Sequence, residues 1–425
     1  MHFSFSQTRV GDGDLEKAAG GILGYQEEIR KIAQQPGYAS PESFINLPGD
    51  GEVYEKVHSL LKEKGKKTKI VVVMGIGGSN LGAQAIYDAL KEEKGLHPVW
   101  FLDAVSTERL TQFKKLLSTI RTPEEIVAIV ISKSGATLET VFNSGAVSSL
   151  LEKQFGEKAF ERFIVISDKG SDLWKKAEER GIATLEIPEK IGGRFSVFSP
   201  VGLAPLAFSG IDLQELRSGA EGVKDECLTE NIQENPALKS AALLFSYVKQ
   251  GRGIHDIFLA SPELESLGKW YRALLAESLG KEGKGITPTV SIGTTDMHSV
   301  GQLMHGGPRD KSMEIVSIEE REENIILPES PFLAGENEKR LLSGCGAEKL
   351  NSALLEGIRK SYAESETPFF EVTLPRKDER SLGAFMMYKM CEVMWLAKLF
   401  GVNGFDQPDV ERYKRYARDI LGKRK

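Results

Sequence analysis

The amino-acid sequence predicts an α/β fold of two domains, each a largely parallel sheet flanked by helices in three α-β-α layers. Its 425 residues exceed one average domain, so two domains are expected. Residues 70–74 and 125–131 are apolar runs without alternation, the pattern of strands buried on both faces. Segments of helical periodicity follow these runs, and repeated strand–helix units build doubly wound parallel sheets.

The first series of strands and helices follows residues 1–65, which we expect to be helical and to pack on the two domains. Strands are expected at 70–74, 99–104, 125–131, 162–168 and 184–187. Helices are expected at 80–90, 107–117, 137–155 and 172–180.

A second series begins near residue 235 and contains fewer saturated runs. We expect strands at 256–260, 313–318 and 369–374, and helices at 236–250, 264–279, 347–364, 381–400 and 407–421. Residues 280–304 are polar and glycine-rich. The predicted division is 1–65 for the N-terminal helical segment, 66–215 for the first domain, 216–403 for the second and 404–425 for a C-terminal helix.

Composition excludes several partner classes. A net charge of −6 without a basic tract argues against nucleic acid. The most apolar stretch, 384–400, contains Lys389, Glu392 and Lys398, which indicates a buried helix and no membrane partner. The first residues lack the pattern of a signal peptide, so we expect no export.

Cysteine usage favours a reducing compartment. The three cysteines, Cys227, Cys345 and Cys391, are widely spaced and lack metal-ligand spacing. We therefore expect packing roles for them, a cytoplasmic location and no metal site.

Two turns have the chemistry of anion sites. The first, Gly75-Ile76-Gly77-Gly78-Ser79, follows a buried strand and opens a helix, where free N–H groups and the helix dipole attract an anion. Its spacing matches neither the dinucleotide fingerprint nor the nucleotide P-loop.

The second turn, 131–140, has the sequence ISKSGATLET and also joins a buried strand to a helix. Ser132, Ser134 and Thr137 supply hydroxyl groups beside free N–H groups, which is how an uncharged loop holds a phosphate. Because parallel strands end at one edge of the sheet, both turns face one crevice.

These motifs resemble those of the glucose-6-phosphate isomerase family, which is built from sugar isomerase domains. The resemblance rests on five motifs in the family's order: GIGGSNLG from Gly75, SKSGATLET from Ser132, GGRFS from Gly192, AESLGK from Ala276 and FDQPDVERYK from Phe405. It implies isomerisation of an aldose to a ketose on a hexose 6-phosphate, specifically glucose 6-phosphate to fructose 6-phosphate, without metal or cofactor.

The resemblance also assigns the proton chemistry. Glu277 is the implied base that moves a proton between C2 and C1 through a cis-enediol(ate), a task that suits a carboxylate whose pKa is raised by burial. Arg194 is the implied cation that stabilises the enediolate, since a guanidinium keeps its proton at neutral pH.

Ring opening needs a second acid/base group. Lys414 resembles the family's C-terminal lysine, and a histidine is expected beside it. The spacing favours His305, with His298 close behind, and Glu139 occupies the position of an acid that orients the histidine.

The resemblance implies a set of residues that bind the substrate and its phosphate. They are Gly77, Gly78, Ser79, Ser132, Lys133, Ser134, Thr137, Glu139 and Gln407. Several positions depart from the family pattern, notably Gly135 and Ala136, where hydroxyl residues are common.

Two alternative functions remain open at this stage. Small residues at Gly135 and Ala136 are compatible with a bifunctional phosphoglucose/phosphomannose isomerase, which an assay with mannose 6-phosphate would identify. A non-catalytic sugar-phosphate sensor predicts decayed catalytic positions, whereas Glu277, Arg194 and Lys414 are all present. The family is usually dimeric, so a homodimer with a shared active site is expected.

Overall fold

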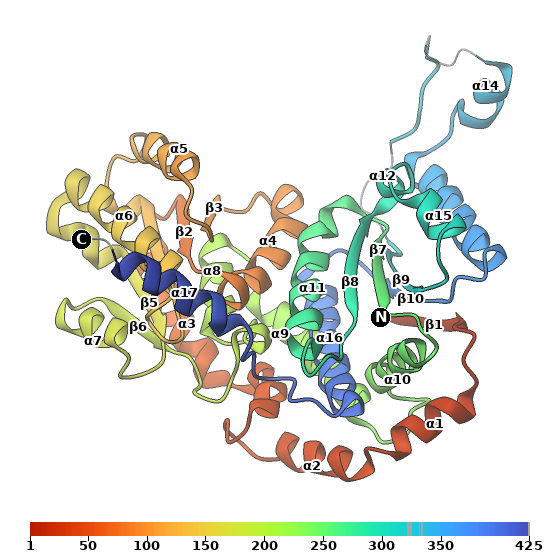
Figure 1. The fold of residues 1–425 in the computed structure, drawn as a ribbon. Helices are drawn as coiled ribbons and strands as arrows, with labels where there is room; N and C mark the ends of the chain where they lie inside the picture. The colour runs from red at the N-terminus through yellow and green to blue at the C-terminus, as the bar shows by residue number, and fades with distance from the viewer. Residues whose placement is uncertain (321–324, 331, 333–334, 424–425) are drawn as a thin grey trace.

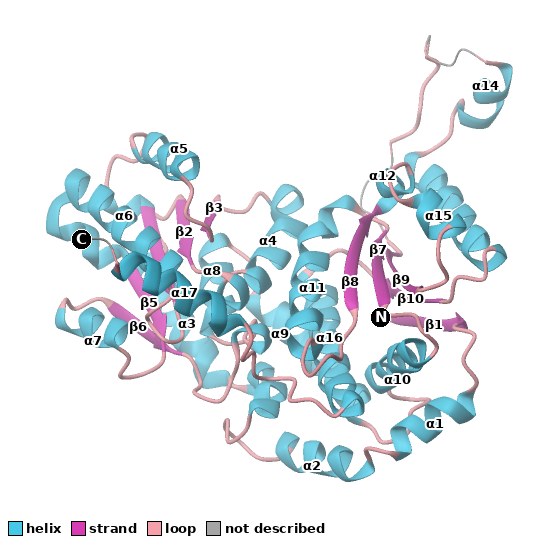
Figure 2. Cartoon of the chain, in the orientation of Figure 1, coloured by secondary structure: helices cyan, strands magenta, loops and turns pink. Residues whose placement is uncertain are grey.

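The computed structural model describes residues 1–320, 325–330, 332 and 335–423 (Figure 1). Two five-stranded sheets lie side by side along the molecule, each flanked by helices (Figure 2). None of the helices in this described part combines the length and apolar content needed to cross a membrane.

The first sheet is entirely parallel, with the strand order β3-β2-β4-β5-β6. Its strands are β2 (Ile70–Met74), β3 (Val99–Leu102), β4 (Ile126–Ile131), β5 (Phe163–Ser167) and β6 (Ala183–Glu186). The connecting helices are α4 (Leu81–Lys94), α5 (Thr107–Leu117), α6 (Leu138–Phe155) and α7 (Asp172–Glu179). Every residue of β2, β4 and β5 is buried, as the saturated runs predict.

Helices cover both faces of this sheet. Alternate residues of β2 point to opposite sides, so Val71 and Val73 pack with α4, α3 (Gly51–Lys64) and α8 (Pro200–Ser209). Val72 and Met74 pack with α5, α6 and α7. The expected three-layer arrangement is confirmed.

The second sheet has the order β1-β10-β9-β7-β8 and is parallel except for β1. Its strands are β1 (His2–Gln7), β7 (Ile254–Leu259), β8 (Thr287–Ile292), β9 (Lys311–Ile318) and β10 (Phe369–Leu374). One face packs with α10 (Pro236–Lys249), α11 (Glu265–Leu279) and α16 (Glu379–Phe400), and the other with α13 (Gly301–Gly306) and α15 (Ala347–Glu364).

The remaining helices link and border these layers. They are α1 (Asp12–Gly20), α2 (Leu23–Ala33), α9 (Leu213–Leu228), α12 (Gly293–Met297), α14 (Glu336–Leu342) and α17 (Val410–Gly422). The proposed limits of the domains stay predictions.

Two parts of the sequence-based prediction of secondary structure are wrong. The segment 1–65 is not helical throughout, because β1 pairs antiparallel with β10, where Phe5 stacks on Phe370 with ring centroids 5.8 Å apart. The segment 280–304 is not only a polar, glycine-rich connection, because it contains β8 at the edge of the sheet. The proline and polar residues of β8 lack the apolar pattern from which strands were predicted.

A buried charge cluster joins α16 to the second sheet. The Lys389 ammonium donates to Glu314 Oε2 at 2.5 Å and to Glu392 Oε2 at 2.9 Å, and all three side chains are 0% exposed. Burial opposes ionisation of Glu314, yet Lys389 and His255 hold the pKa of this carboxyl below its usual value. The ammonium also lies 4.3 Å from the centroid of the Tyr271 ring.

Replacing Lys389 by methionine therefore leaves two buried carboxylates without their cation. We expect Lys389→Met to lower the free energy of unfolding by about 3–5 kcal/mol. Lys360→Met is the control, because that side chain is 73% exposed and its ion pair with Glu356 spans 3.6 Å. Denaturant titration measures both changes, and equal stability of the two variants would contradict the importance of the cluster.

Candidate functional site

The turn after β2 packs directly on the turn that carries Arg194. Residues Gly77–Ser79 form the short helix η2, and Gly193–Phe195 form η5. A Cβ placed on Gly78 would lie 2.3 Å from the carbonyl carbon of Gly193. Glycine is therefore required at this position for close approach of two backbones, and the first anion turn supports the Arg194 turn.

Arg194 is the best-connected side chain of the site. It is buried, and its Nη1 donates to Glu277 Oε2 at 3.1 Å and to Gln407 Oε1. Its Nε donates to Ser278 Oγ at 3.2 Å. Burial lowers the pKa of the guanidinium and the neighbouring Glu277 opposes this shift, but an arginine keeps its charge at neutral pH.

Glu277 lies in the last turn of α11, with one side against Arg194 and the other open. The side chain is 41% exposed in this chain. The resemblance implies a buried carboxylate at this position, but Glu277 is not buried in the single chain. The open side leaves room for a ligand to reach the carboxylate.

The second anion turn follows β4, the neighbour of β2. Ser132 is buried, and its hydroxyl donates to Thr137 Oγ1 at 3.3 Å. Ser134 Oγ accepts from the Ala136 N–H at 3.3 Å. An ideal Cβ on Gly75 would lie 3.2 Å from the Ile131 carbonyl oxygen, so the two turns are adjacent.

Lys133 points away from this turn. Its ammonium donates to the carbonyl of Glu189 at 2.6 Å and to that of Ile191 at 3.0 Å. These carbonyls lie just before the turn that carries Arg194. This geometry indicates that Lys133 holds that turn, whereas the sequence resemblance implied contact with the phosphate.

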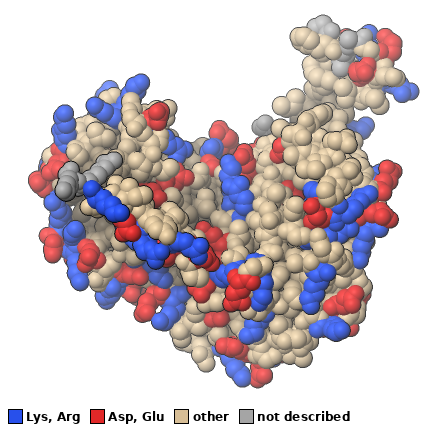
Figure 3. All heavy atoms as spheres, in the orientation of Figure 1, with Lys and Arg blue, Asp and Glu red and all other residues tan. Residues whose placement is uncertain are grey.

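Helix α17 places Lys414 beside the second anion turn. A cavity of about 380 Å³ is lined by Ser134, Thr137 and Glu139 on one side and by Lys414 on the other. The Lys414 ammonium donates to Glu411 Oε1 at 2.6 Å, and this bond lowers the pKa of Glu411. A band of basic side chains runs along α17 in Figure 3.

The two candidate histidines differ in their surroundings. His305 faces two serine hydroxyls at the end of α15: its Nε2 lies 3.3 Å from Oγ of Ser361, in the helix, and its Nδ1 lies 3.4 Å from Oγ of Ser365, which follows it. Burial lowers the pKa of His305. His298, between α12 and α13, is exposed.

Neither histidine lies near Glu277 along the fold of one chain. Glu277 is close to the amino end of β8, because α11 runs back along the sheet before β8 begins, whereas His298 and His305 follow the carboxyl end of β8. The six residues of β8 separate these two ends by about 20 Å. The chain therefore brings together Gly78, Arg194, Glu277 and Gln407, but not the histidine.

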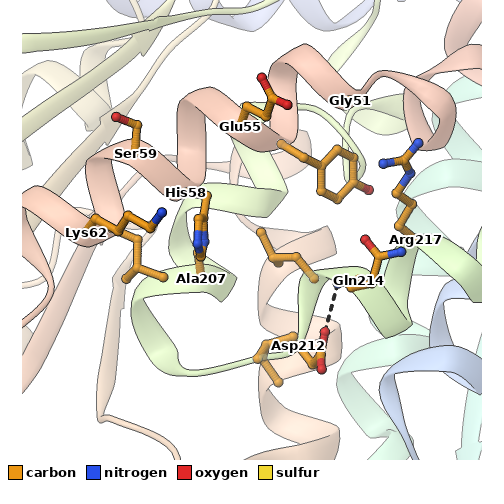
Figure 4. A pocket seen from close by; sticks show the side chains of 13 residues that line it. Gly51, Glu55, His58, Ser59, Lys62, Ala207, Asp212, Gln214 and Arg217 are labelled. Carbon is orange, nitrogen blue, oxygen red and sulfur yellow. Dashed lines mark hydrogen bonds between the residues drawn. The ribbon is translucent and has the colours of Figure 1, made fainter.

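A larger cavity lies elsewhere. It has a volume of about 650 Å³ and lies between α3 and the start of α9, with His58, Lys62, Asp212 and Arg217 in its wall (Figure 4). None of the predicted site residues lines it, so its size is no guide to the chemistry.

Sequence reasoning missed three residues that hold the site together. Ser278 and Asp406 contact Arg194, through a hydroxyl at 3.2 Å and a backbone carbonyl at 3.0 Å respectively, and Lys281 pairs with Asp406 at 2.9 Å. All three lie inside the quoted motifs, which was the available signal. Within the described residues, no group of three or more His, Cys, Asp or Glu is placed to hold a metal ion.

Comparison with solved structures finds the same fold in other proteins. A hypothetical protein from Thermus thermophilus superposes with a TM-score of 0.86 at 30% identity, covering 99% of each chain. A glucose-6-phosphate isomerase from Chlamydia trachomatis superposes with a TM-score of 0.81 at 21% identity, covering 99% of this chain and 88% of the other, and shows the same fold. Fold and motifs together define a sugar isomerase.

Comparison of sequences then gives the family. Residues 52–425 match the family described as phosphoglucose isomerase. A glucose-6-phosphate isomerase from Carboxydothermus hydrogenoformans is 31% identical over an alignment that covers 100% of this chain and 93% of the relative. The chain belongs to the phosphoglucose isomerase family.

The contact between η2 and η5 can be tested at Gly78. Gly78→Ala forces the two turns apart and displaces Arg194, so we expect kcat/KM for the isomerisation to fall at least about tenfold. Gly145→Ala is the matched control, because a Cβ on Gly145, inside α6, meets no atom within 4 Å. Steady-state assays compare the variants, and equal rates would show that the turns tolerate separation.

Proposed function

We propose that this protein interconverts D-glucose 6-phosphate and D-fructose 6-phosphate by proton transfer between C2 and C1 through a cis-enediol(ate). The observation that carries the proposal is the contact of the half-open Glu277 carboxylate with the buried Arg194 guanidinium, 3.1 Å apart. A base beside a fixed cation is the pairing that removes a proton next to a carbonyl and stabilises the resulting charge.

The phosphate is proposed to bind at the two anion turns. Backbone N–H groups at Gly77 and Gly78 and the hydroxyls of Ser79 and Thr137 supply donors there, while Ser132 holds the Thr137 hydroxyl by donating to it at 3.3 Å. The N-terminus of α6 adds its dipole to the second turn. This set clasps a phosphate with uncharged groups and leaves the cations for the reacting end of the sugar.

Glu277 is proposed to carry the proton between C2 and C1. Arg194 stabilises the enediolate oxygen, and Gln407, which also contacts Arg194, orients the sugar. When substrate covers the open side of Glu277, it removes water from around the carboxylate.

Ring opening is proposed to use Lys414 and His298. Sequence spacing favours His305, but both ring nitrogens of His305 face serine hydroxyls, of Ser361 in α15 and of Ser365 just after it. The exposed position of His298 supports it as the group that reaches substrate.

The active site is proposed to be shared in a homodimer. His298 and Glu277 lie near opposite ends of β8, so a histidine for the Glu277 pocket has to come from a second chain. In a twofold dimer each chain then supplies His298 to its partner.

Exposed apolar side chains support this assembly. On α6, beside the second anion turn, Val141 and Phe142 are more than half exposed, and on α13 and α15 Leu303, Leu350 and Leu354 are exposed. In Figure 1 α14 projects away from the body, and Phe332 just before it is 92% exposed. We propose these exposed side chains as candidate contacts with the second chain.

A cytoplasmic location is proposed from the cysteines. Cys227, Cys345 and Cys391 are free thiols in the structure. Free buried thiols are typical of a reducing compartment.

Replacing Glu277 by glutamine tests the assignment of the base. We expect Glu277→Gln to reduce kcat by at least about a hundredfold, the usual loss for a general base, while the affinity for glucitol 6-phosphate stays nearly unchanged. Glu282→Gln, in the turn after α11 with a 70% exposed side chain, is the control. A variant Glu277→Gln that turns over at the wild-type rate would exclude Glu277 as the base.

Mixing two inactive variants tests the shared site. Glu277→Gln and His298→Asn, unfolded and refolded together, form mixed dimers in which one of the two sites has both native residues. Random twofold assembly then restores about a quarter of wild-type activity. No recovery, with dimers verified by light scattering, would show that both residues act from the same chain.

A further inference from the structure

Lys281 lies in the turn after α11, and its ammonium is buried among partners from the protein. Its side chain is 8% exposed, and its ammonium contacts the Ser278 carbonyl at 3.1 Å, Asp406 Oδ1 at 2.9 Å and the Asn403 carbonyl. An ammonium has three donors, so these contacts use all of them. Lys281 is therefore committed to the protein and has none left for a substrate.

One of these contacts is to the helix that carries the proposed base. The Ser278 carbonyl lies in the last turn of α11, one residue after Glu277, where carbonyls lack partners within the helix. A cation at this end also interacts favourably with the helix dipole. The ammonium thus fastens the end of α11 that presents Glu277.

The other contacts are to the segment 403–407, which leads into α17. Arg194 holds this segment from its other side, donating from Nη2 to the carbonyls of Gly404 at 3.2 Å and Asp406 at 3.0 Å. The segment is consequently fixed between two buried cations. Within it, Asn403 Nδ2 donates to Asp406 Oδ2 at 3.1 Å.

Helix α17 depends on this attachment for its position. None of its described residues is buried, and the rings of Tyr413 and Tyr416 are more than half exposed. In Figure 1 the helix is the dark blue element that lies across the first sheet. Because it lacks a core face, the fixed segment before it determines where Lys414 lies.

We propose that Lys281 is a positioning residue that fixes the segment 403–407 against the end of α11 and so sets Lys414 relative to Glu277. The inference rests on the proposed function, because Lys414 matters for turnover only if it takes part in ring opening. Loss of the ammonium frees Asp406 and lets α17 drift. A displacement near 1 Å at a reacting group costs about a hundredfold in rate.

The experiment compares Lys281→Met with Lys284→Met, a control in the same turn whose side chain is 42% exposed. We expect Lys281→Met to lower kcat for glucose 6-phosphate about 10- to 100-fold, with the control near wild type. The double variant Lys281→Met/Lys414→Met should be no slower than Lys414→Met alone, because both substitutions disable the same group, the ammonium of Lys414.

Amide hydrogen exchange supplies a readout independent of turnover. We expect faster exchange over 403–409 in Lys281→Met, and a smaller change in the same direction in Asp406→Asn, which keeps the lysine and serves if Lys281→Met does not fold. Unchanged exchange, or additive losses of kcat in the double variant, would overturn the proposal. If exchange is faster in Lys281→Met but Lys414→Met keeps full activity, Lys281 does position α17, and the proposed role of Lys414 in ring opening is refuted.

Discussion

The whole site depends on one buried guanidinium. Arg194 contacts α11 through Glu277 and Ser278, and it contacts the segment before α17 through backbone carbonyls and Gln407. A planar group with five donors can join segments that converge from different directions, and a lysine at this position would offer fewer donors in a less rigid geometry. The partners of the guanidinium offset the free-energy cost of its burial.

The contacts that Arg194 makes with α11 explain why a glycine stands at position 78. Arg194 reaches α11 only if its turn packs closely on the turn after β2, and Gly78 permits that contact. Lys133 also holds the Arg194 turn, because its ammonium donates to the Glu189 and Ile191 carbonyls that precede this turn. The two anion turns and Glu277 are therefore connected through packed contacts, although the turns follow strands of the first sheet and Glu277 lies on a helix that packs on the second.

Much of the fold was predictable from local patterns. The strands of the first sheet are saturated apolar runs, and such runs have few alternatives to a buried parallel strand. β1 and β8 were missed because an edge strand needs no such run: β1 alternates phenylalanine with serine, and β8 contains Pro288. Their pairing is decided by partners distant in sequence, such as β10 for β1.

The residues of the candidate site were predictable from sequence motifs, but the contacts between their side chains were not. The motifs point to Glu277 and Arg194 as separate residues, whereas their contact depends on how the η5 turn packs against the end of α11. The direction of a lysine side chain is likewise set by tertiary contacts, so Lys133 and Lys281 could not be assigned from spacing. The surroundings of His305 required the position of α15.

We propose that Arg194 and Glu277 act on the same two carbons of the sugar while the phosphate occupies the two anion turns. A crystal structure with glucitol 6-phosphate bound tests it most directly. We expect hydrogen-bond distances, about 2.7–3.2 Å, from the Arg194 guanidinium to an oxygen on C1 or C2, with Glu277 facing the same carbons. A phosphate bound elsewhere, or a guanidinium facing away from C1 and C2, would contradict it.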